Sequence, residues 1–316
     1  MRDVSLRTAA AFAVLLAGMT AANAADNSPV LHKIKSAGAI AIGYRDSAIP
    51  MSYLDAQQQP IGFSIELCGL IANQVKQMLG MPDLKVNYVP VTPSDRASLV
   101  QNGSVDLVCE ATPVTAELQH QVGLSTPIFT SELRWIVPRR LRVEREGRRR
   151  PRTEIISPSS AEDLKGKTIV LTQGSPATPL VLTLSNERSL GLSILEAKDN
   201  AEAFHLVETG RASAFLADDV ILAGLKAGAK NPDAFGFLAD AYPGTPYALL
   251  LRKDDKAFKD LVDGVLSRAM KSGDYGQLYT KWFESPIPPK NVNLDVPMPQ
   301  KLKELVKVPE HAAVSN

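Results

Sequence analysis

Apolar runs and amphipathic stretches alternate along the first third of the chain, and this pattern predicts alternating strands and helices. Ala39 to Tyr44 and Leu84 to Val91 are apolar runs with the length of buried strands. Between them, Leu67, Ile71 and Val75 recur at the spacing of one helix face. Strands that alternate with helices favour a parallel sheet with right-handed crossovers, so we expect an α/β fold.

The stretch from Ser94 to Leu118 predicts a short helix, a buried strand and a loop that opens another helix. Ser94 can cap the first helix and Gly103 can end it, and the apolar run Val105 to Ala111 has the length of a strand. Asp106 interrupts that run. Small molecules bind beyond the carboxyl ends of strands in α/β sheets, so we expect a binding site where this run ends.

A second set of elements follows an extended segment at Phe129 to Pro138. The expected strands are Thr168 to Thr172, Ser193 to Ala197, Ala212 to Ala217 and Tyr247 to Leu251. The expected helices are one beginning near Ala177, then Ala201 to Thr209, Asp255 to Lys271 and Tyr275 to Phe283. This repetition of the first pattern predicts a second α/β unit.

The first residues have the three parts of a secretory signal peptide. Arg2 and Arg7 supply positive charge, Ala9 to Met19 is an apolar core, and Ala22-Asn23-Ala24 is a small-x-small cleavage site. The apolar run is shorter than the roughly 20 residues that a membrane-spanning helix needs, which argues against a transmembrane anchor. The residue directly after the cleavage site is not a cysteine, which argues against a lipid anchor. We expect an exported, periplasmic protein that begins at Ala25.

Length and charge narrow the class of protein. Removing 24 of the 316 residues leaves 292, which exceeds one comfortable core and indicates two domains or lobes. The composition is that of a globular protein, with 45% hydrophobic and 22% charged residues. The formal net charge is +1 and the signal segment itself carries +1, so the mature chain is near neutral. Nothing in this balance indicates binding to nucleic acid or to a membrane surface.

One segment departs from this neutrality. Arg139 to Arg152 contains eight arginines and two glutamates, a net charge of +6. Such a run can bind an acidic partner or anionic lipid, but it has no periodic apolar face, and we favour a solvated loop. The proline-rich tail from Pro286 is expected to pack as an extended strap.

The two cysteines, Cys68 and Cys109, have two possible states. An even number of cysteines in an oxidising compartment favours a disulfide. The alternative is a pair of buried free thiols, since both lie in apolar sequence.

Three charged residues stand at the ends of predicted elements and are expected to face a cleft. Arg45 follows the first predicted strand. Arg96 lies on the short helix before the predicted strand at 105–111, and Asp218 ends a strand of the second unit. Two guanidinium groups can together hold an anionic group, and a carboxylate can accept an ammonium. Each residue alone is more often a surface ion-pair partner. Asp219 is the alternative to Asp218.

Seven segments of the chain resemble one known family. They are GYRDSAIPMSY at 43–53, PVTPSDR at 90–96, LVQNGSVDLVCEAT at 99–112, EAKDN at 196–200, GRASAFLADDVILAG at 210–224, LLRKDD at 250–255 and KWFESPIPPKNVN at 281–293. In this order they resemble the periplasmic glutamate/aspartate-binding proteins of ABC amino-acid importers, within family 3 of the solute-binding proteins. The resemblance covers nearly all of the chain after the first two dozen residues.

The resemblance implies a type II periplasmic-binding-protein fold. Each lobe would be a mostly parallel sheet flanked by helices, and the chain would cross between the lobes twice at a hinge. Lobe 1 would comprise residues 30–135 plus 244–285, lobe 2 residues 136–243, and the strap residues 286–316, after the signal peptide at 1–24. From the pattern alone, two sequential domains fit nearly as well. Close relatives also place cysteines at Cys68 and Cys109, which implies the disulfide.

The resemblance also assigns roles to the charged residues. Arg45 and Arg96 match arginines that receive the side-chain carboxylate of the ligand, and Asp218 matches the aspartate that takes its α-ammonium. The full set of expected ligand-binding residues is Arg45, Arg96, Ala111, Thr112, Ser175, Asn200 and Asp218.

The departures from the family matter as much as the matches. The family's loop reads Gly-Ser-Thr-Thr with an arginine five residues later, whereas this chain has Glu110-Ala111-Thr112-Pro113 and Leu118. That arginine clamps the α-carboxylate in the family, and losing such a hydrogen bond costs roughly 1.5–3 kcal/mol. Pro93, Pro176 and Asn200 replace a serine, a threonine and a histidine. We therefore expect a ligand with an acidic group and an amine or hydroxyl, but with a different second end.

The leading hypothesis is a monomeric, non-enzymatic solute-binding protein that delivers its ligand to an ABC permease, without cofactor, metal or nucleic acid. The four histidines lack metal-ligand spacing. A second hypothesis is a periplasmic enzyme like the cyclohexadienyl dehydratases of this fold, with Glu110 as general acid. Glu110 could instead point away from the cleft, because it follows Cys109 at the strand end. A third hypothesis is a repurposed binding or sensor protein.

Overall fold

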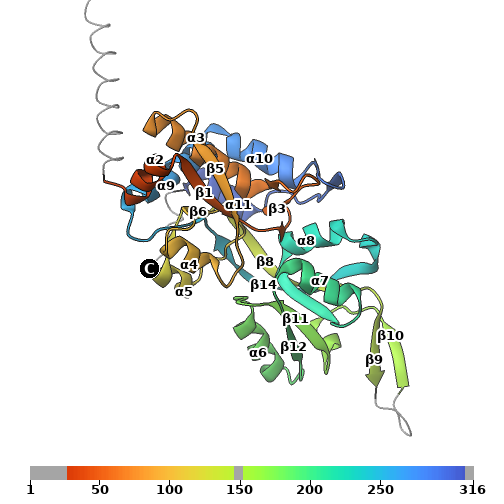
Figure 1. The fold of residues 1–316 in the computed structure, drawn as a ribbon. Coiled ribbons are helices and arrows are strands. Elements are labelled where there is room, and N and C mark those ends of the chain that lie inside the picture. Colours follow the sequence, from red (N-terminus) through yellow and green to blue (C-terminus); the bar gives the residue numbers. More distant parts are fainter. Residues whose placement is uncertain (1–26, 146–151, 310–316) are drawn as a thin grey trace, which may run out of the picture.

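The computed structural model describes residues 27–145 and 152–309 and shows two lobes, each built around its own sheet (Figure 1). The predicted signal peptide and the middle of the arginine-rich run lie outside the described residues. Two five-stranded sheets organise the described part of the chain, with strand orders β5-β1-β6-β15-β7 and β12-β11-β13-β8-β14. The prediction of a two-lobe α/β fold with helices around each sheet is confirmed.

The first sheet is parallel on one side and antiparallel on the other. Its strands are β1 (Ala39–Tyr44), β5 (Lys85–Pro90), β6 (Leu107–Val108), β7 (Gly123–Leu124) and β15 (Leu250–Leu251). The strand β1 pairs in parallel with β5 and β6, and β15 runs antiparallel to β6 and β7. The strand that the sequence predicts at 105–111 is shorter in the structure, although the backbone amide of Asp106 still donates to the carbonyl oxygen of Ala41 and its buried carboxylate accepts from the amide of Ala41.

Helices and a small sheet surround the first sheet. They are α2 (Pro29–Ala37), α3 (Phe63–Leu79), α4 (Arg96–Gln101), α5 (Ala116–Gln121), α9 (Lys256–Ser272), α10 (Asp274–Phe283) and the strands β2 (Ser47–Ala48), β3 (Ser52–Leu54) and β4 (Pro60–Ile61). The predicted helical stripe of Leu67, Ile71 and Val75 is fully buried on α3. Aromatic rings join α3 to α10, where Phe63 lies 5.2 Å from the ring centre of Phe283. Such edge-on packing makes this face of the lobe a continuous core.

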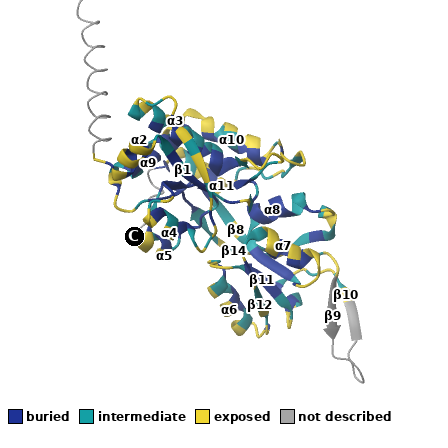
Figure 2. Ribbon diagram, viewed as in Figure 1, coloured by how far each residue is buried: buried dark blue, intermediate teal, exposed yellow. Residues whose placement is uncertain are grey.

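The second sheet contains both strands that run toward the first lobe. Its strands are β8 (Phe129–Pro138), β11 (Thr168–Thr172), β12 (Ser193–Ala197), β13 (Ala214–Asp218) and β14 (Phe235–Tyr247). Around them lie α6 (Thr178–Glu187), α7 (Asn200–Glu208), α8 (Asp219–Gly228) and the short turns η1 (Ala161–Leu164) and η2 (Pro232–Ala234). Buried residues concentrate along the central strands of both lobes, and exposed residues mark the outer helix faces (Figure 2).

The strands β8 and β14 form a long antiparallel pair that passes between the lobes. Their register runs from Phe235 opposite Pro138 to Tyr247 opposite Phe129, with shifts between Phe237 and Ala241 and between Pro243 and Pro246. The sequence predicts a strand at 247–251, but the paired segment ends at Tyr247 and β15 begins at Leu250 in the other sheet. The chain therefore changes sheets within this predicted strand.

Two further segments differ from the sequence expectation. The arginine-rich run is expected as a loop, but its flanks form a hairpin of β9 (Leu141–Arg145) and β10 (Arg152–Ile156) that projects from the second lobe (Figure 1). The tail is expected as an extended strap, but it contains the hairpin of β16 (Pro286–Ile287) and β17 (Val292–Asn293) and the helix α11 (Gln300–Lys307). Leu302 explains the helix, because α11 buries this side chain fully against the rest of the protein.

A disulfide joins Cys68 on α3 to Cys109 at the end of β6, which confirms that prediction. It fixes α3 to Cys109, the residue that directly precedes Glu110. The backbone of Glu110 is held on the same side, because Ser64 Oγ, also on α3, donates a 3.1 Å hydrogen bond to its carbonyl oxygen.

Candidate functional site

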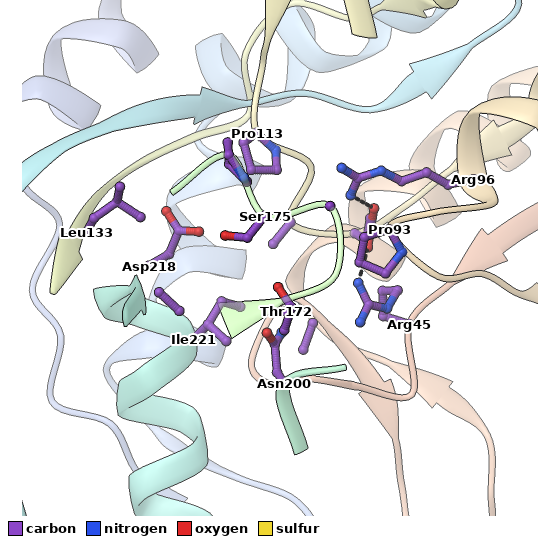
Figure 3. A pocket seen from close by; sticks show the side chains of 16 residues that line it. Arg45, Pro93, Arg96, Pro113, Leu133, Thr172, Ser175, Asn200, Asp218 and Ile221 are labelled. Atoms are coloured by element: carbon purple, nitrogen blue, oxygen red, sulfur yellow. Dashed lines mark hydrogen bonds and ion pairs between the residues drawn. The ribbon is translucent and has the colours of Figure 1, made fainter. Parts of the chain in front are cut away.

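A cavity of about 60 Å³ lies between the lobes, at the ends of the central strands of both sheets (Figure 3). The first lobe contributes Arg45, Ala48, Pro93, Arg96, Glu110, Ala111 and Pro113. The crossing strand and the second lobe contribute Leu133, Thr172, Gly174, Ser175, Pro176, Asn200, Ala217, Asp218 and Ile221.

Arg45 and Arg96 approach the cavity from two different elements. Arg45 follows β1, and its backbone amide donates a 2.9 Å hydrogen bond to the buried hydroxyl of Ser52 on β3. Arg96 begins the short helix α4, whose N-cap residue is Asp95 and not the predicted Ser94. Only 5% of Arg45 and 6% of Arg96 is exposed. Two guanidinium groups this deeply buried need a counter-charge.

Glu110 supplies the counter-charge to both arginines. Its Oε2 lies 3.3 Å from Nη1 of Arg45, and its Oε1 forms an ion pair with Nη1 of Arg96. Thr112 Oγ1 donates a further 2.9 Å hydrogen bond to Oε1. The dashed lines at Arg45 and Arg96 in Figure 3 mark these ion pairs. The arginine pair that the sequence assigns to a ligand carboxylate already holds a carboxylate of this chain.

The environment of Glu110 favours its ionised form. Desolvation by burial acts to raise the pKa of this carboxyl, but the charges of Arg96 and Arg45 and the hydrogen bonds from Arg96 and Thr112 outweigh it. The pKa of Glu110 is therefore lowered from its ordinary value. Of the two orientations that the sequence left open, the side chain takes the one that lines the cleft.

Asp218 lies on the opposite side of the cavity. It ends β13 and stands at the N-cap position of α8, and the hydroxyl of Ser131 on β8 donates a hydrogen bond to its Oδ1. Within residues 27–145 and 152–309, no basic side chain forms an ion pair with this carboxylate. Burial, only partly offset by the Ser131 and Tyr247 hydroxyls, raises the pKa of Asp218 to about 6. A cationic group beside it would stabilise the charged form.

The remaining predicted site residues divide into two groups. Ala111, Ser175 and Asn200 line the same cavity as the charged residues. Thr112 does not line it, because its fully buried hydroxyl is engaged with Glu110 behind the cavity wall. Asp219, the alternative to Asp218, does not line the cavity. Its carboxylate instead accepts a hydrogen bond from the backbone amide of Val220.

Sequence reasoning missed part of the lining. Thr172 could have been found, because it ends a correctly predicted strand at the edge where ligands bind. Leu133 and Ile221 carry no chemical signal in the sequence that separates them from core residues. Glu110 did carry a signal: a lone carboxylate at the end of a strand, in a chain with two arginines expected at the same edge.

Leu118, which stands where the resembled family has an arginine, lies outside the cleft. It packs with Val100, Val122 and Leu250 in an apolar cluster of the first lobe, and 9% of it is exposed. No other basic side chain than Arg45 and Arg96 lines the cavity among the described residues. The described ranges also contain no group of three or more His, Cys, Asp or Glu placed to hold a metal, and none of their helices could span a membrane.

The sequence profile of the bacterial extracellular solute-binding proteins, family 3, matches residues 40–285. The chain belongs to this family. It is therefore a solute-binding protein, which confirms the family and the main function inferred from its sequence motifs.

Curated relatives match the chain over nearly its whole length. The L-glutamate/L-aspartate-binding protein of Pseudomonas aeruginosa is 37% identical over 315 residues, covering 98% of this chain and 97% of the relative. The glutamate/aspartate import solute-binding protein of Salmonella typhimurium is 36% identical over 309 residues, covering 96% and 97%. These relatives are named as binding and import proteins, not as enzymes.

Solved structures of amino-acid-binding proteins share the fold. An ancestral arginine-binding protein bound to arginine has a TM-score of 0.65 at 24% identity and covers 78% of this chain and 98% of its own. An ancestral amino acid-binding protein described as a precursor of cyclohexadienyl dehydratase has a TM-score of 0.63 at 25% identity, covering 80% and 98%. The type II binding-protein fold predicted from the sequence is thus confirmed.

Proposed function

We propose that this solute-binding protein captures a small amino-acid-like molecule between its lobes in the periplasm and delivers it to the permease of an ABC importer. The observation that carries the proposal is the placement of opposite charges on the two sides of one cleft. Arg45 and Arg96 stand on the first lobe, and Asp218 faces them from the second. The full-length match to import proteins that are named for amino acids supports the same function.

A ligand drives closure only if it contacts both lobes, because it must bind the closed state more tightly than the open one. We assign residues 30–135 plus 244–285 to lobe 1 and 136–243 to lobe 2. On this assignment the lining is divided between the lobes, and Gly174 of lobe 2 lies opposite Pro93 of lobe 1. A ligand ammonium at Asp218 and a polar group near Arg96 would bridge them. The closed form would then dock as a monomer on the permease.

The groups of the second lobe indicate how the ligand is oriented. Asp218 would accept its ammonium, while the hydroxyls of Ser175 and Thr172 and the amide of Asn200 offer further hydrogen bonds. The positive φ of 70° at Gly174 allows the tight turn that presents Ser175 to the cleft. These are neutral groups, so they orient a ligand without adding charge.

The enzyme alternative gains no support from Glu110. A general acid at neutral pH needs a pKa raised toward 7, but the arginines lower the pKa of this carboxyl. Asp218 has a raised pKa of about 6, but it lies at the position expected for the ligand ammonium. We therefore propose binding without catalysis.

A ligand screen tests this function. The protein is produced by export to the periplasm, so that the disulfide forms, and stripped of endogenous ligand by partial unfolding and refolding. Its melting temperature is then measured with each common amino acid, small amines and dicarboxylates. At least one amino acid is expected to stabilise the fold by about 2.7 kcal/mol at a hundredfold excess over Kd. Asp218→Asn is the control and should lose most of that shift; a screen with no stabilising amino acid contradicts the proposal.

A further inference from the structure

The carboxylate of Glu110 occupies the position between the two arginines of the cleft. It contacts Nη1 of both Arg45 and Arg96, and only 1% of the residue is exposed. In this arrangement the Nη1 nitrogen of each guanidinium, which could otherwise bond a ligand carboxylate, is already engaged by Glu110. A second carboxylate that entered here would meet a fixed negative charge at contact distance.

Glu110 is held in place on several sides, so it cannot easily give way to a ligand. Thr112 Oγ1 bonds its carboxylate and Ser64 Oγ bonds its backbone oxygen. The preceding residue, Cys109, is tied to α3 by the disulfide. Moving the side chain away would also leave two buried guanidinium groups without their shared partner.

The charges that line the cavity sum to zero. Arg45 and Arg96 contribute +2, Glu110 contributes −1 and Asp218 contributes −1. The first-lobe side therefore keeps one uncompensated positive charge, and the second-lobe side keeps one negative charge. Nε of Arg96 is buried and has no hydrogen-bond acceptor among the described residues, so a donor remains on the positive side.

This charge pattern is complementary to a zwitterion with one carboxylate and one ammonium. A dicarboxylic amino acid carries a further carboxylate, which would face Glu110 and leave a net negative charge in a buried site. The rest of the lining is mostly apolar or small, with Pro93, Pro113, Leu133 and Ile221 among it. Such walls accept an uncharged side chain of modest size.

We propose that Glu110 is a built-in replacement for the second carboxylate of an acidic ligand, so that this cleft selects a small, net-neutral amino acid and rejects dicarboxylic ones. This inference rests on the proposed function. It assigns the ligand class, and it makes Glu110 the residue that determines specificity.

The affinity of the wild-type protein is the first test. Calorimetric titration with L-alanine, L-serine, L-leucine and L-glutamine is compared with titration by L-glutamate, L-aspartate and glutarate. The best neutral amino acid should bind at least about 30-fold more tightly than any of the dicarboxylates, a ratio that corresponds to about 2 kcal/mol. Tighter binding of glutamate or aspartate overturns the inference but leaves the proposed function intact. Absence of binding by every amino acid is the distinct failure of the proposed function, and the inference falls with it.

Substitution of Glu110 tests its role directly. Glu110→Gly removes the carboxylate and opens space between the arginines, and its melting temperature should now rise with L-glutamate and glutarate. Glu110→Gln fills the same space and should show no such gain. If Glu110→Gly does not fold alone, Glu110→Ala is refolded with and without 20 mM glutarate, and only the sample with glutarate should recover the native circular dichroism spectrum.

The contrary outcome is a folded variant that lacks the Glu110 carboxylate and still shows no response to dicarboxylates. That result overturns the inference.

Discussion

At the scale of single residues, two carboxylates in one cleft have opposite properties. Glu110 has two guanidinium partners, and its pKa is lowered. Asp218 has only hydroxyl partners among the described residues, and burial raises its pKa to about 6. The first carboxylate is satisfied by the protein itself, whereas the second is not. Asp218 is thus the carboxylate that a cationic ligand group would stabilise most.

The raised pKa of Asp218 means that its charge weakens the ligand-free fold. Stability from this group is fully present below its unfolded pKa near 3.8 and is lost as pH rises through about 6. Asp218→Asn should therefore raise the free energy of unfolding at pH 7.5 by about 1–2 kcal/mol, after allowance for partial exposure. Urea titrations at pH 7.5 and pH 3.8 check this, because the difference between the two proteins should shrink at the lower pH.

The contribution of Glu110 to the free energy of unfolding has the opposite pH dependence. It is the same in the wild-type and Asp218→Asn proteins. Its lowered pKa gives stability that is present above 4.5 and lost as pH falls. Because this loss occurs equally in the wild-type and Asp218→Asn proteins, subtracting their urea curves isolates Asp218. An equal or lower stability of Asp218→Asn at pH 7.5 would contradict a destabilising charge at this position.

The sequence placed Arg45, Arg96 and Asp218 at the ends of elements, and the structure brings them to one cavity, while their ligand-binding roles stay predictions. The sequence could give these positions because each residue follows or begins an element whose position in the sheet is regular. It did not show that Arg45 and Arg96 would pair with Glu110, because rotation about the Glu110 side-chain bonds decides between cleft and core. That choice depends on burial and on partners such as Thr112, which no local pattern encodes.

At the scale of elements, α8 lies in tight contact with the other lobe. A Cβ atom on Gly224 would come within 2.4 Å of the carbonyl oxygen of Ile49, in the loop after β2. Real side chains essentially never approach a backbone oxygen so closely. The absence of a side chain at Gly224 therefore allows this closeness of the lobes.

Gly224→Ala should force α8 and the Ile49 loop apart. Ligand affinity should then fall by about tenfold or more, because the closed state is penalised while the residues of the cleft are unchanged. Small-angle X-ray scattering at saturating ligand should give a larger radius of gyration than for the wild type. Gly228→Ala, on the same helix with open space around it, is the matched control and should change neither quantity.

The disulfide connects the core helix α3 with the strand that leads into the cleft. The two cysteines are 41 residues apart, and closing a loop of that size contributes about 4 kcal/mol in the chain-entropy model. Replacing both Cys68 and Cys109 by serine should lower the free energy of unfolding by about 2–4 kcal/mol in urea titrations. A change below 1 kcal/mol would show that the bridge constrains the unfolded chain little.

Elements with strong periodicity were predicted closely, whereas short or sheet-switching ones were not. The bounds of β1, β8, β11 and β12 match the predicted segments because each is a single extended segment that enters one sheet. The prediction of one strand at 247–251 failed because Tyr247 belongs to one sheet and Leu250 and Leu251 belong to the other. Apolar character alone does not show where the chain passes from one sheet to the next. The prediction for the tail failed because its prolines were given more weight than the apolar face of α11, on which Leu302 is buried and Leu305 and Val306 pack against the core.

At the scale of the whole molecule, the chain leaves the first sheet along β8 and returns to it at β15. The sequence pattern left two sequential domains open, because periodicity contains no information on which distant strands pair. The family resemblance implied the double crossing, and the pairing of β15 with β6 and β7 agrees with it. The antiparallel pair of β8 and β14 therefore connects the lobes.

Because Glu110 belongs to the same chain as its arginine partners, it acts on them as a tethered competitor. A group attached by a short linker is present at an effective concentration on the order of millimolar or higher, whatever the surroundings contain. A free dicarboxylate would have to exceed that value to take its place. The protein would therefore ignore fluctuating levels of acidic amino acids outside the cell, and its occupancy would report the supply of its own ligand alone.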